Sequence, residues 1–188
     1  MKINTLDLNK LNSKDPKIKY GFAKELLRIG ASAPEPLYEH FDHWTKMFSS
    51  SNNILKWTAI DIIGYISAID KENKTYRTIN NLFNFLHGGQ LITCNHAIYA
   101  LGLIAKNKPT NRTKIIKELL AVSEDTFETK ECKDIAIGKV IETLKNFSDE
   151  IKDDKEVIKF ISQAQRCERN ATKKKADSLL KIIQKKRK

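Results

Sequence analysis

Glycine and proline are scarce in this sequence, at 7 and 4 of its 188 residues. Long stretches therefore run without a strong breaker, which favours helices over a strand-rich fold with many turns. No stretch of alternating polarity is long enough to predict a sheet. Hydrophobic residues make up 40% of the chain and charged residues 30%. This composition is too apolar for a disordered chain and too charged for a membrane protein.

Long apolar runs and paired cysteines are also lacking. The most apolar stretch covers residues 57–69 and is interrupted by Asp61, so it is too short and too polar to span a bilayer. The first twenty residues are polar and rich in lysine, which predicts no signal peptide. The three cysteines, Cys94, Cys132 and Cys167, show no short-range pairing pattern. They indicate free thiols in a reducing compartment, and we expect a cytoplasmic protein.

Few residues in the sequence match a catalytic or metal-binding pattern. His40 and His43 stand three apart, whereas the helix of a zinc hydrolase carries two histidines four apart with a glutamate beside the first. Further metal ligands are not identifiable, and no glycine-rich phosphate loop is present. The His-Gly-Gly segment at 87–89 instead predicts the end of a helix. We therefore expect no enzyme, no cofactor and no metal site.

Positive charge is abundant and unevenly placed. The formal net charge is +11, and residues 166–188 alone carry ten basic residues against two acidic ones, or +8. The rest of the chain is left with only +3. Such asymmetry indicates an anionic partner at one end of the molecule. A cap that only aids solubility is the alternative.

A pattern of about 38 residues repeats along the chain. Its plainest copy reads Leu-Lys-Trp-Thr-Ala from residue 55, with an Ile-Gly pair four residues after the alanine. The alanines of four copies, at 59, 97, 136 and 176, are spaced by 38, 39 and 40 residues, and an earlier copy starts at Ile18. Apolar residues at i, i+4 and i+7 lie on one stripe of a helix. Between these stripes lie second amphipathic segments, at 37–48, 76–86, 115–122 and 156–164. Thr110 and Ser148 are plausible starts of the helices that contain the last two segments.

The Leu55-Lys56-x-x-Ala59-x-x-x-Ile63-Gly64 pattern resembles the second helix of a HEAT repeat, with lysine in place of arginine. The resemblance covers roughly residues 14–186 and implies an all-α fold, a right-handed α-solenoid of about five HEAT-like helical hairpins. Stacked pairs of this kind bury a continuous core that one pair could not. We expect a single domain over 1–188, with units near 5–30, 35–69, 72–107, 110–146 and 149–186. Residues 166–188 form its basic C-terminal cap.

In HEAT-like arrays the second helices line a concave face, and this implies where a partner would bind. On the helix predicted from residue 52 to 69, Trp57, Asp61 and Tyr65 point away from the apolar stripe. Aromatic side chains on such a surface anchor a peptide well, because they bury much area at low entropy cost. Trp57 packed between repeats is the alternative. Shifting by the repeat spacing completes the predicted set of partner-binding residues: Tyr20, Lys24, Trp57, Asp61, Tyr65, Asn95, Tyr99, Lys174 and Lys181.

Two functions remain after these exclusions. The first is a non-catalytic scaffold or adaptor that binds another protein or peptide. An acidic partner would complement the positive charge of the chain. The second is a nucleic-acid-associated module that uses the basic surface. It includes the alkylpurine DNA glycosylases, some of which are built from HEAT-like repeats, although their catalytic residues cannot be matched here one by one. Oligomeric state does not follow from the sequence.

Overall fold

The computed structural model describes residues 6–187, and in that range it contains ten α-helices and no strand. The predicted all-α class is confirmed. The ends of the first predicted unit and of the basic cap, residues 5 and 188, lie outside the described residues. The helices run in the order α1 (Pro16–Ser32), α2 (Glu35–Tyr38), α3 (Phe41–Lys46), α4 (Asn53–Ile66), α5 (Ile79–Leu86), α6 (Leu91–Asn107), α7 (Pro109–Ala121), α8 (Lys130–Leu144), α9 (Lys155–Ala164) and α10 (Asn170–Lys186).

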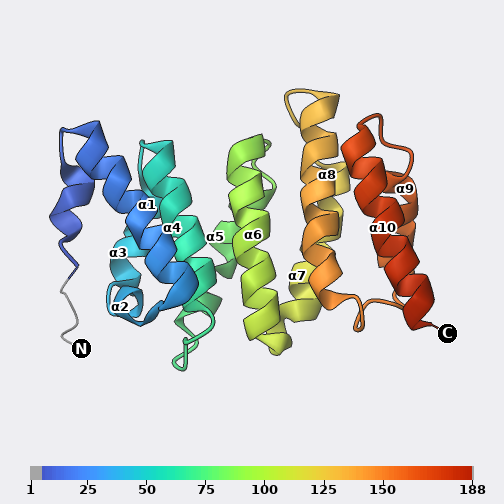
Figure 1. The fold of residues 1–188 in the computed structure, drawn as a ribbon, viewed down its shortest axis with the longest axis horizontal. Coiled ribbons are helices and arrows are strands. Elements are labelled where there is room, and N and C mark those ends of the chain that lie inside the picture. Colours follow the sequence, from blue (N-terminus) through green and yellow to red (C-terminus); the bar gives the residue numbers. More distant parts are fainter. Residues whose placement is uncertain (1–5, 188) are drawn as a thin grey trace.

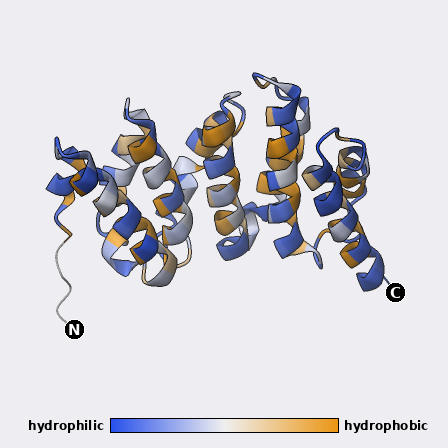
Figure 2. Ribbon diagram, turned by 45° about the horizontal axis from the view of Figure 1, so that its top comes forward, coloured by the Kyte–Doolittle hydropathy of each residue, from blue (hydrophilic) through white to orange (hydrophobic). Residues whose placement is uncertain are grey.

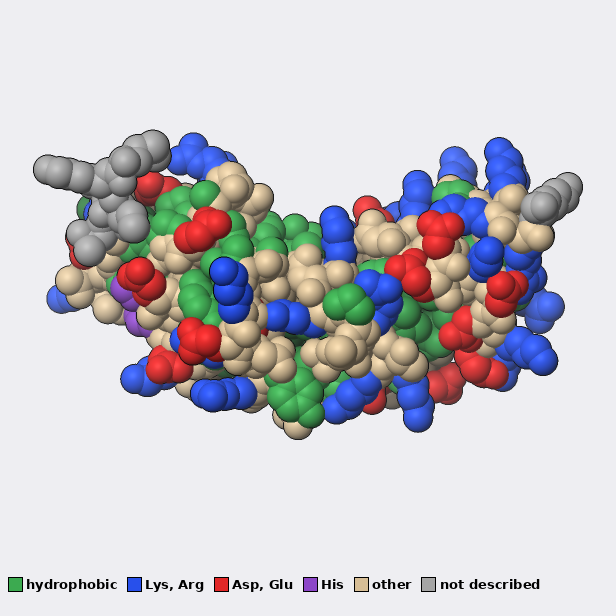
Figure 3. Space-filling view, turned by 90° about the horizontal axis from the view of Figure 1, so that it is seen from below, with side chains coloured by type: hydrophobic (Ala, Val, Ile, Leu, Met, Phe, Trp, Pro, Cys, Tyr) green, Lys and Arg blue, Asp and Glu red, His purple; other side chains and the backbone are tan. Residues whose placement is uncertain are grey.

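The helices form two layers along one long axis. In Figure 1, α1, α4, α6, α8 and α10 lie side by side in the front layer, in chain order. The shorter helices α2, α3, α5, α7 and α9 lie behind them, and α1 and α10 lie at opposite ends of the front row. Hydrophobic and hydrophilic residues alternate around each helix (Figure 2), so each helix has an apolar side to turn toward its neighbours. The front layer is hollowed: the upper edge of Figure 3 dips between the two ends of the molecule.

The repeated small residues lie where the front helices meet. Ala59, Ala97, Ala136 and Ala176 are all fully buried, as predicted for the core stripe. The glycines of the same row allow a still closer approach. A Cβ added at Gly64 would lie 2.8 Å from Cα of Ala100 on α6, and one added at Gly102 would lie 2.6 Å from Cγ2 of Thr143 on α8. The backbones of α4 and α6 thus come close to each other at Gly64, whereas at Gly102 a side chain of α8 packs against the backbone of α6.

The back layer supplies the large side chains of the core. Trp44 on α3 is fully buried, and its indole nitrogen donates a 2.8 Å hydrogen bond to the carbonyl of Leu37. The His40 amide donates to the same carbonyl. The Leu37 carbonyl thus accepts hydrogen bonds from Trp44 and His40 rather than from the amide four residues later, as a continuous helix would require. The amphipathic segment predicted over 37–48 is accordingly divided into α2 and α3.

Two predicted helix starts are wrong by different amounts. The sequence places Thr110 ahead of a helix, but α7 begins one residue earlier, with Pro109 in its first turn. The sequence also favours Ser148 as the start of the next segment, but α9 begins only at Lys155. Its cap is Asp154, whose Oδ1 accepts the backbone N–H of Glu156 at 2.9 Å and of Val157 at 3.2 Å. Because the Asp154 carboxylate accepts hydrogen bonds from two backbone amides, α9 starts after Asp154 rather than after Ser148, six residues upstream.

Candidate functional site

Two adjacent front helices, α4 and α6, bring aromatic rings together. The α4 helix is capped by Asn52, whose side-chain oxygen accepts the amides of Ile54 and Leu55. Most of the helix is then buried, whereas Trp57 and Tyr65 are only half-buried. We call Trp57 and Tyr65 of α4, with His96 and Tyr99 of α6, the aromatic cluster.

The aromatic cluster consists of two ring pairs. The Trp57 and His96 rings are stacked, with centroids 5.5 Å apart and planes within 8°. The Tyr65 and Tyr99 rings meet edge to face at 5.9 Å, and the Tyr99 hydroxyl donates to the Tyr65 hydroxyl at 3.2 Å. Burial raises the pKa of the Tyr65 hydroxyl, and the hydrogen bond with Tyr99 adds to the rise. Tyr99 itself is 44% exposed. The cluster is thus ordered by its own contacts while part of it still faces solvent.

Asp61 differs from the prediction. Its side chain does not face a partner: the residue is only 7% exposed, and its carboxylate is occupied by His96, whose Nδ1 lies 2.9 and 3.0 Å from the two oxygens. Burial raises the pKa of the Asp61 carboxyl, and the hydrogen bond and charge of His96 oppose that rise. The carboxylate therefore orients the imidazole, which in turn supports the Trp57 ring.

The sequence leaves open whether Trp57 lies on a binding surface or packs between repeats, and the structure shows features of both. It is half-buried against α6, where its Nε1 donates a 3.0 Å hydrogen bond to the Thr93 hydroxyl. That hydroxyl donates onward to Gln90 Oε1 at 3.3 Å. The indole is packed between helices and still lines an open pocket, so it is both a structural contact and a part of the surface.

The other predicted residues are distributed along the front layer. Tyr20 on α1 accepts a 3.0 Å hydrogen bond from Asn52 Nδ2, next to the start of α4. Asn95 on α6 is half-buried, and its side-chain oxygen has no hydrogen-bond partner in the described part of the chain. Lys24 on α1, and Lys174 and Lys181 on α10, are exposed. The structure therefore groups Trp57, Asp61, Tyr65 and Tyr99, and places the three lysines toward the two ends.

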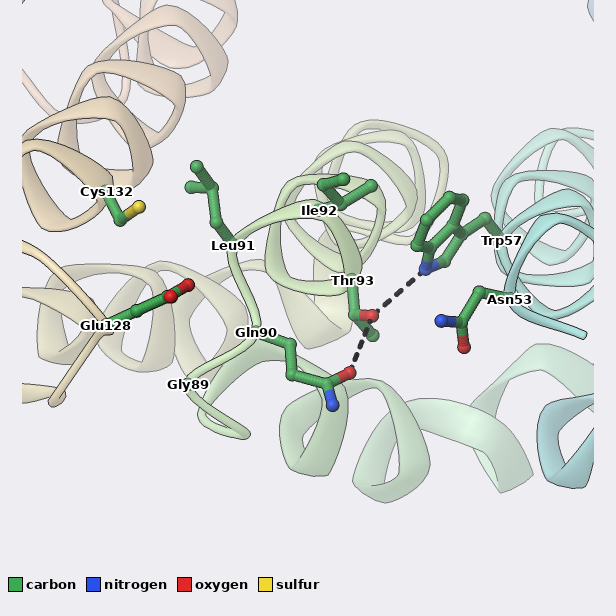
Figure 4. A pocket seen from close by; sticks show the side chains of 9 residues that line it. All are labelled: Asn53, Trp57, Gly89, Gln90, Leu91, Ile92, Thr93, Glu128 and Cys132. Atoms are coloured by element: carbon green, nitrogen blue, oxygen red, sulfur yellow. Dashed lines mark hydrogen bonds between the residues drawn. The ribbon is translucent and has the colours of Figure 1, made fainter. Parts of the chain in front are cut away.

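A pocket of about 540 Å³ opens beside the cluster, where the first turns of α4, α6 and α8 come together. Figure 4 shows Trp57 and Asn53 on one side of it and Glu128 and Cys132 on the other, with the start of α6 between them. Its lining residues are Asn53, Trp57, Gly89, Gln90, Leu91, Ile92, Thr93, Glu128 and Cys132. We call it the α6 pocket.

Sequence reasoning did not identify His96 or His87 as site residues. His96 lies one helical turn before Tyr99, so an i, i+3 test on the predicted face could have found it. His87 follows α5, and its ring nitrogens lie 2.8 Å from Asp125 and 3.2 Å from Glu118, on two later elements. No local sequence pattern predicts the contacts of His87 with Asp125 and Glu118, because both acidic residues lie more than thirty positions later in the chain.

Two of the cysteines, Cys94 and Cys167, and the His40–His43 segment contribute to packing. Burial raises the pKa of Cys94 to about 12, and burial with a hydrogen bond to Asp134 raises that of Cys167 to about 11, which disfavours a reactive thiolate at either position. His40 and His43 meet the Trp44 ring edge-on. In residues 6–187 no group of three or more His, Cys, Asp or Glu side chains is placed to hold a metal ion. Within the same residues, no helix has both the length and the apolar character that crossing a membrane requires.

Comparison with known proteins identifies no family. No protein-family model matches the chain, and no curated protein matches it. Among solved structures, the chain is similar to an engineered protein whose crystal structure comes from the Northeast Structural Genomics Consortium. The alignment covers 95% of each chain, with a TM-score of 0.47 and 14% sequence identity. A likeness at this level supports no statement about function.

Proposed function

We propose that the chain is a right-handed α-solenoid of HEAT-like hairpins whose concave face binds another protein, without a catalytic residue, cofactor or metal of its own. The ordered row of front helices and the buried alanines at the repeat spacing support this architecture. The three free cysteines support a cytoplasmic setting.

One observation carries the binding proposal. The rings of the aromatic cluster contact one another in two pairs across α4 and α6, and the buried Thr93 and Asp61 side chains fix Trp57 and His96 from beneath. Rings that are ordered before binding lose little entropy when a partner covers them, and Trp and Tyr are enriched among residues that dominate binding energy. The Asp61–His96 contact supports the same role, because it fixes the orientation of a ring that stacks on Trp57.

Replacing Trp57 and Tyr99 together with alanine should weaken partner binding at least about tenfold, since buried aromatic anchors often contribute about 2 kcal/mol or more. Partners would be captured from a nuclease-treated cytoplasmic extract, identified, and titrated with parent and variant. Tyr76→Ala is the matched control, because Tyr76 is 57% exposed but follows α4 in the turn leading to α5. A double variant that unfolds, or that binds as the parent does, would remove the aromatic cluster as the binding site.

A nucleic-acid-associated module is the second candidate, and the exposed lysines of α10 favour it. Lys186 and Arg187 are paired with Asp149 and Asp153 near the start of the α9 hairpin. For Lys174, Lys181 and Lys185, by contrast, no ion pair is found within residues 6–187, and all three are exposed. They form a cationic surface at one end of the molecule.

Changing Lys174, Lys181 and Lys185 to glutamine tests this candidate. If the three lysines neutralise phosphates, the slope of log affinity against log salt for a generic DNA duplex should become shallower by about 0.9 for each phosphate that the variant no longer neutralises. Glutamine at Lys117, Lys155 and Lys159, exposed on the back layer, removes the same charge and should change the slope less. Equal slopes for the two triple variants would show that the α10 lysines do not bind nucleic acid specifically and serve only solubility.

A further inference from the structure

The α6 pocket is negative in a strongly positive protein. Of its nine lining residues Glu128 is the only charged one, although the chain has 34 lysines and arginines against 23 acidic residues. No hydrogen bond or ion pair of the Glu128 carboxylate is found in the described part of the chain. In Figure 4 this side chain extends from the loop before α8 toward Leu91 and the open centre of the pocket.

The remaining walls of the pocket are apolar or carry neutral amides. Leu91 and Ile92 line the pocket, and Ile92 is 53% exposed, so its side chain is open to a ligand. Trp57 supplies the aromatic wall on the α4 side. The amides of Asn53 and Gln90 lie along the rim, where they can donate to and accept from a peptide backbone. The pocket thus combines a long apolar wall with one carboxylate at its far side.

The loop that carries Glu128 is held in place from the α5–α6 side. His87 Nδ1 lies 2.8 Å from Asp125 Oδ2, three residues before Glu128. Gly89 has a positive φ of 74°, and a Cβ there would lie 2.9 Å from the Thr126 carbonyl oxygen. The Thr129 hydroxyl then accepts the Cys132 amide at 3.1 Å and caps α8. Contacts on both sides of Glu128 therefore fix its backbone before any ligand arrives.

We propose that the α6 pocket holds an arginine side chain of the partner's peptide segment. The proposal rests on the proposed protein-binding function and names the chemistry of the partner at one position. An arginine stem would cover the apolar wall, and its guanidinium would pair with the Glu128 carboxylate. Arginine fits better than lysine, because its planar, weakly hydrated head matches a carboxylate with two parallel hydrogen bonds. An acidic side chain would meet Glu128 with like charge.

The direct test follows the Trp57 indole N–H by NMR while a blocked Ser-Leu-Arg-Leu-Ser peptide is added. Trp57→Phe assigns the indole signal, since Trp44 is the second tryptophan and is fully buried. We expect the Trp57 signal to shift, and the same peptide with citrulline for arginine to bind about tenfold more weakly, which is typical of removing a charged hydrogen bond. Citrulline keeps the shape of arginine but carries an oxygen in place of one NH2 group, so it loses the charge and one of the two parallel hydrogen-bond donors.

Glu128→Gln should weaken binding of the arginine peptide about tenfold as well, and should bring the arginine and citrulline peptides to similar affinity. Because Glu128 is exposed, the variant should fold as the parent does. Glu131→Gln is the matched control: it removes the same charge three residues away, from a side chain that pairs with Arg169 and does not line the pocket. We expect it to change the affinity less than about twofold, because exposed ion pairs contribute little.

Three results would overturn the assignment: no shift of the Trp57 signal at millimolar peptide, equal affinity for the arginine and citrulline peptides, or equal affinity for a lysine peptide. The last would show that charge alone is recognised. These results are separable from failure of the binding function itself. A protein whose partner binding depends on Trp57 and Tyr99 but not on Glu128 keeps the proposed function and loses only the arginine pocket.

Discussion

Replacing Asp70 with alanine should lower the free energy of unfolding by about 3 kcal/mol, since each buried donor left without a partner costs about 1–3 kcal/mol. Asp70 follows α4 and is 1% exposed. Its carboxylate accepts the amides of Lys74 and Thr75 at 2.8 Å, the Thr75 hydroxyl at 2.7 Å and the Tyr38 hydroxyl at 3.0 Å. Its backbone carbonyl also accepts a hydrogen bond from Lys108. One residue thus joins α2, the turn before α5 and the end of α6.

The same carboxylate should make stability depend on pH. Burial alone would raise the pKa of Asp70, but the hydrogen bonds from Thr75, Lys74 and Tyr38 outweigh it and hold the pKa below its usual value. A folded-state pKa below the unfolded one stabilises the protein above the unfolded pKa, which is about 3.9. The stability difference between the parent and Asp70→Asn should therefore be constant near neutral pH and shrink as pH falls below about 4.

Thermal and urea unfolding at pH 7 and at acid pH would measure both effects. For a chain of this size, about 3 kcal/mol corresponds to a drop in Tm of roughly 6–12 °C. Glu72→Gln is the control, because Glu72 lies two residues away, also approaches Tyr38, and is 63% exposed in its side chain. It should change stability by less than about 1 kcal/mol. An Asp70→Ala protein as stable as Glu72→Gln would contradict the proposed network.

Two glycine-to-alanine substitutions should change stability in opposite directions. At Gly64 the added methyl group would lie 2.8 Å from Cα of Ala100 and 3.1 Å from Cδ1 of Leu103, so α4 and α6 must move apart. Overpacking of this kind costs about 1–3 kcal/mol. At Gly21, in the middle of α1, the added Cβ meets nothing within 4 Å. There alanine should add about 1 kcal/mol, because it is the better helix former.

The pair separates backbone approach from helix propensity, since the chemical change is the same at both positions. Chemical unfolding of the two variants and the parent, fitted with a common m-value, would give the two free-energy changes. If Gly64→Ala were also stabilising, propensity would outweigh packing there, and the close approach of α4 to α6 would not be a determinant of the fold.

The helical class was predictable because each amphipathic stripe is long and regular. Ala59, Ala97, Ala136 and Ala176 follow one period, and their burial needs no knowledge of distant partners. Boundaries were less predictable where a tertiary contact decides them. The split at Leu37 depends on the Trp44 indole, and the start of α9 depends on a choice between two capping residues, Asp154 and Ser148.

The candidate site was predictable as a face and not as a set of contacts. Helical spacing put Trp57, Tyr65 and Tyr99 on one surface, and in the structure Tyr65 meets Tyr99 while Trp57 stacks on His96. The same spacing put Asp61 beside them, because a helical wheel cannot show that a histidine on the next helix covers the carboxylate. Glu128 and His87 lie in loops, where side-chain direction follows from contacts with other elements rather than from a period.

The serial arrangement of the front helices bears on how the molecule can deform. The main contacts of the front row join each helix to the next one, so a path from α1 to α10 runs through α4, α6 and α8 in series. A small change in the angle between any two neighbouring helices would therefore add to the changes at the other helix pairs along the row. We therefore expect each helix pair to be stiff and the row of pairs to be flexible. The two ends of the molecule would then move toward or away from a ligand in the hollow.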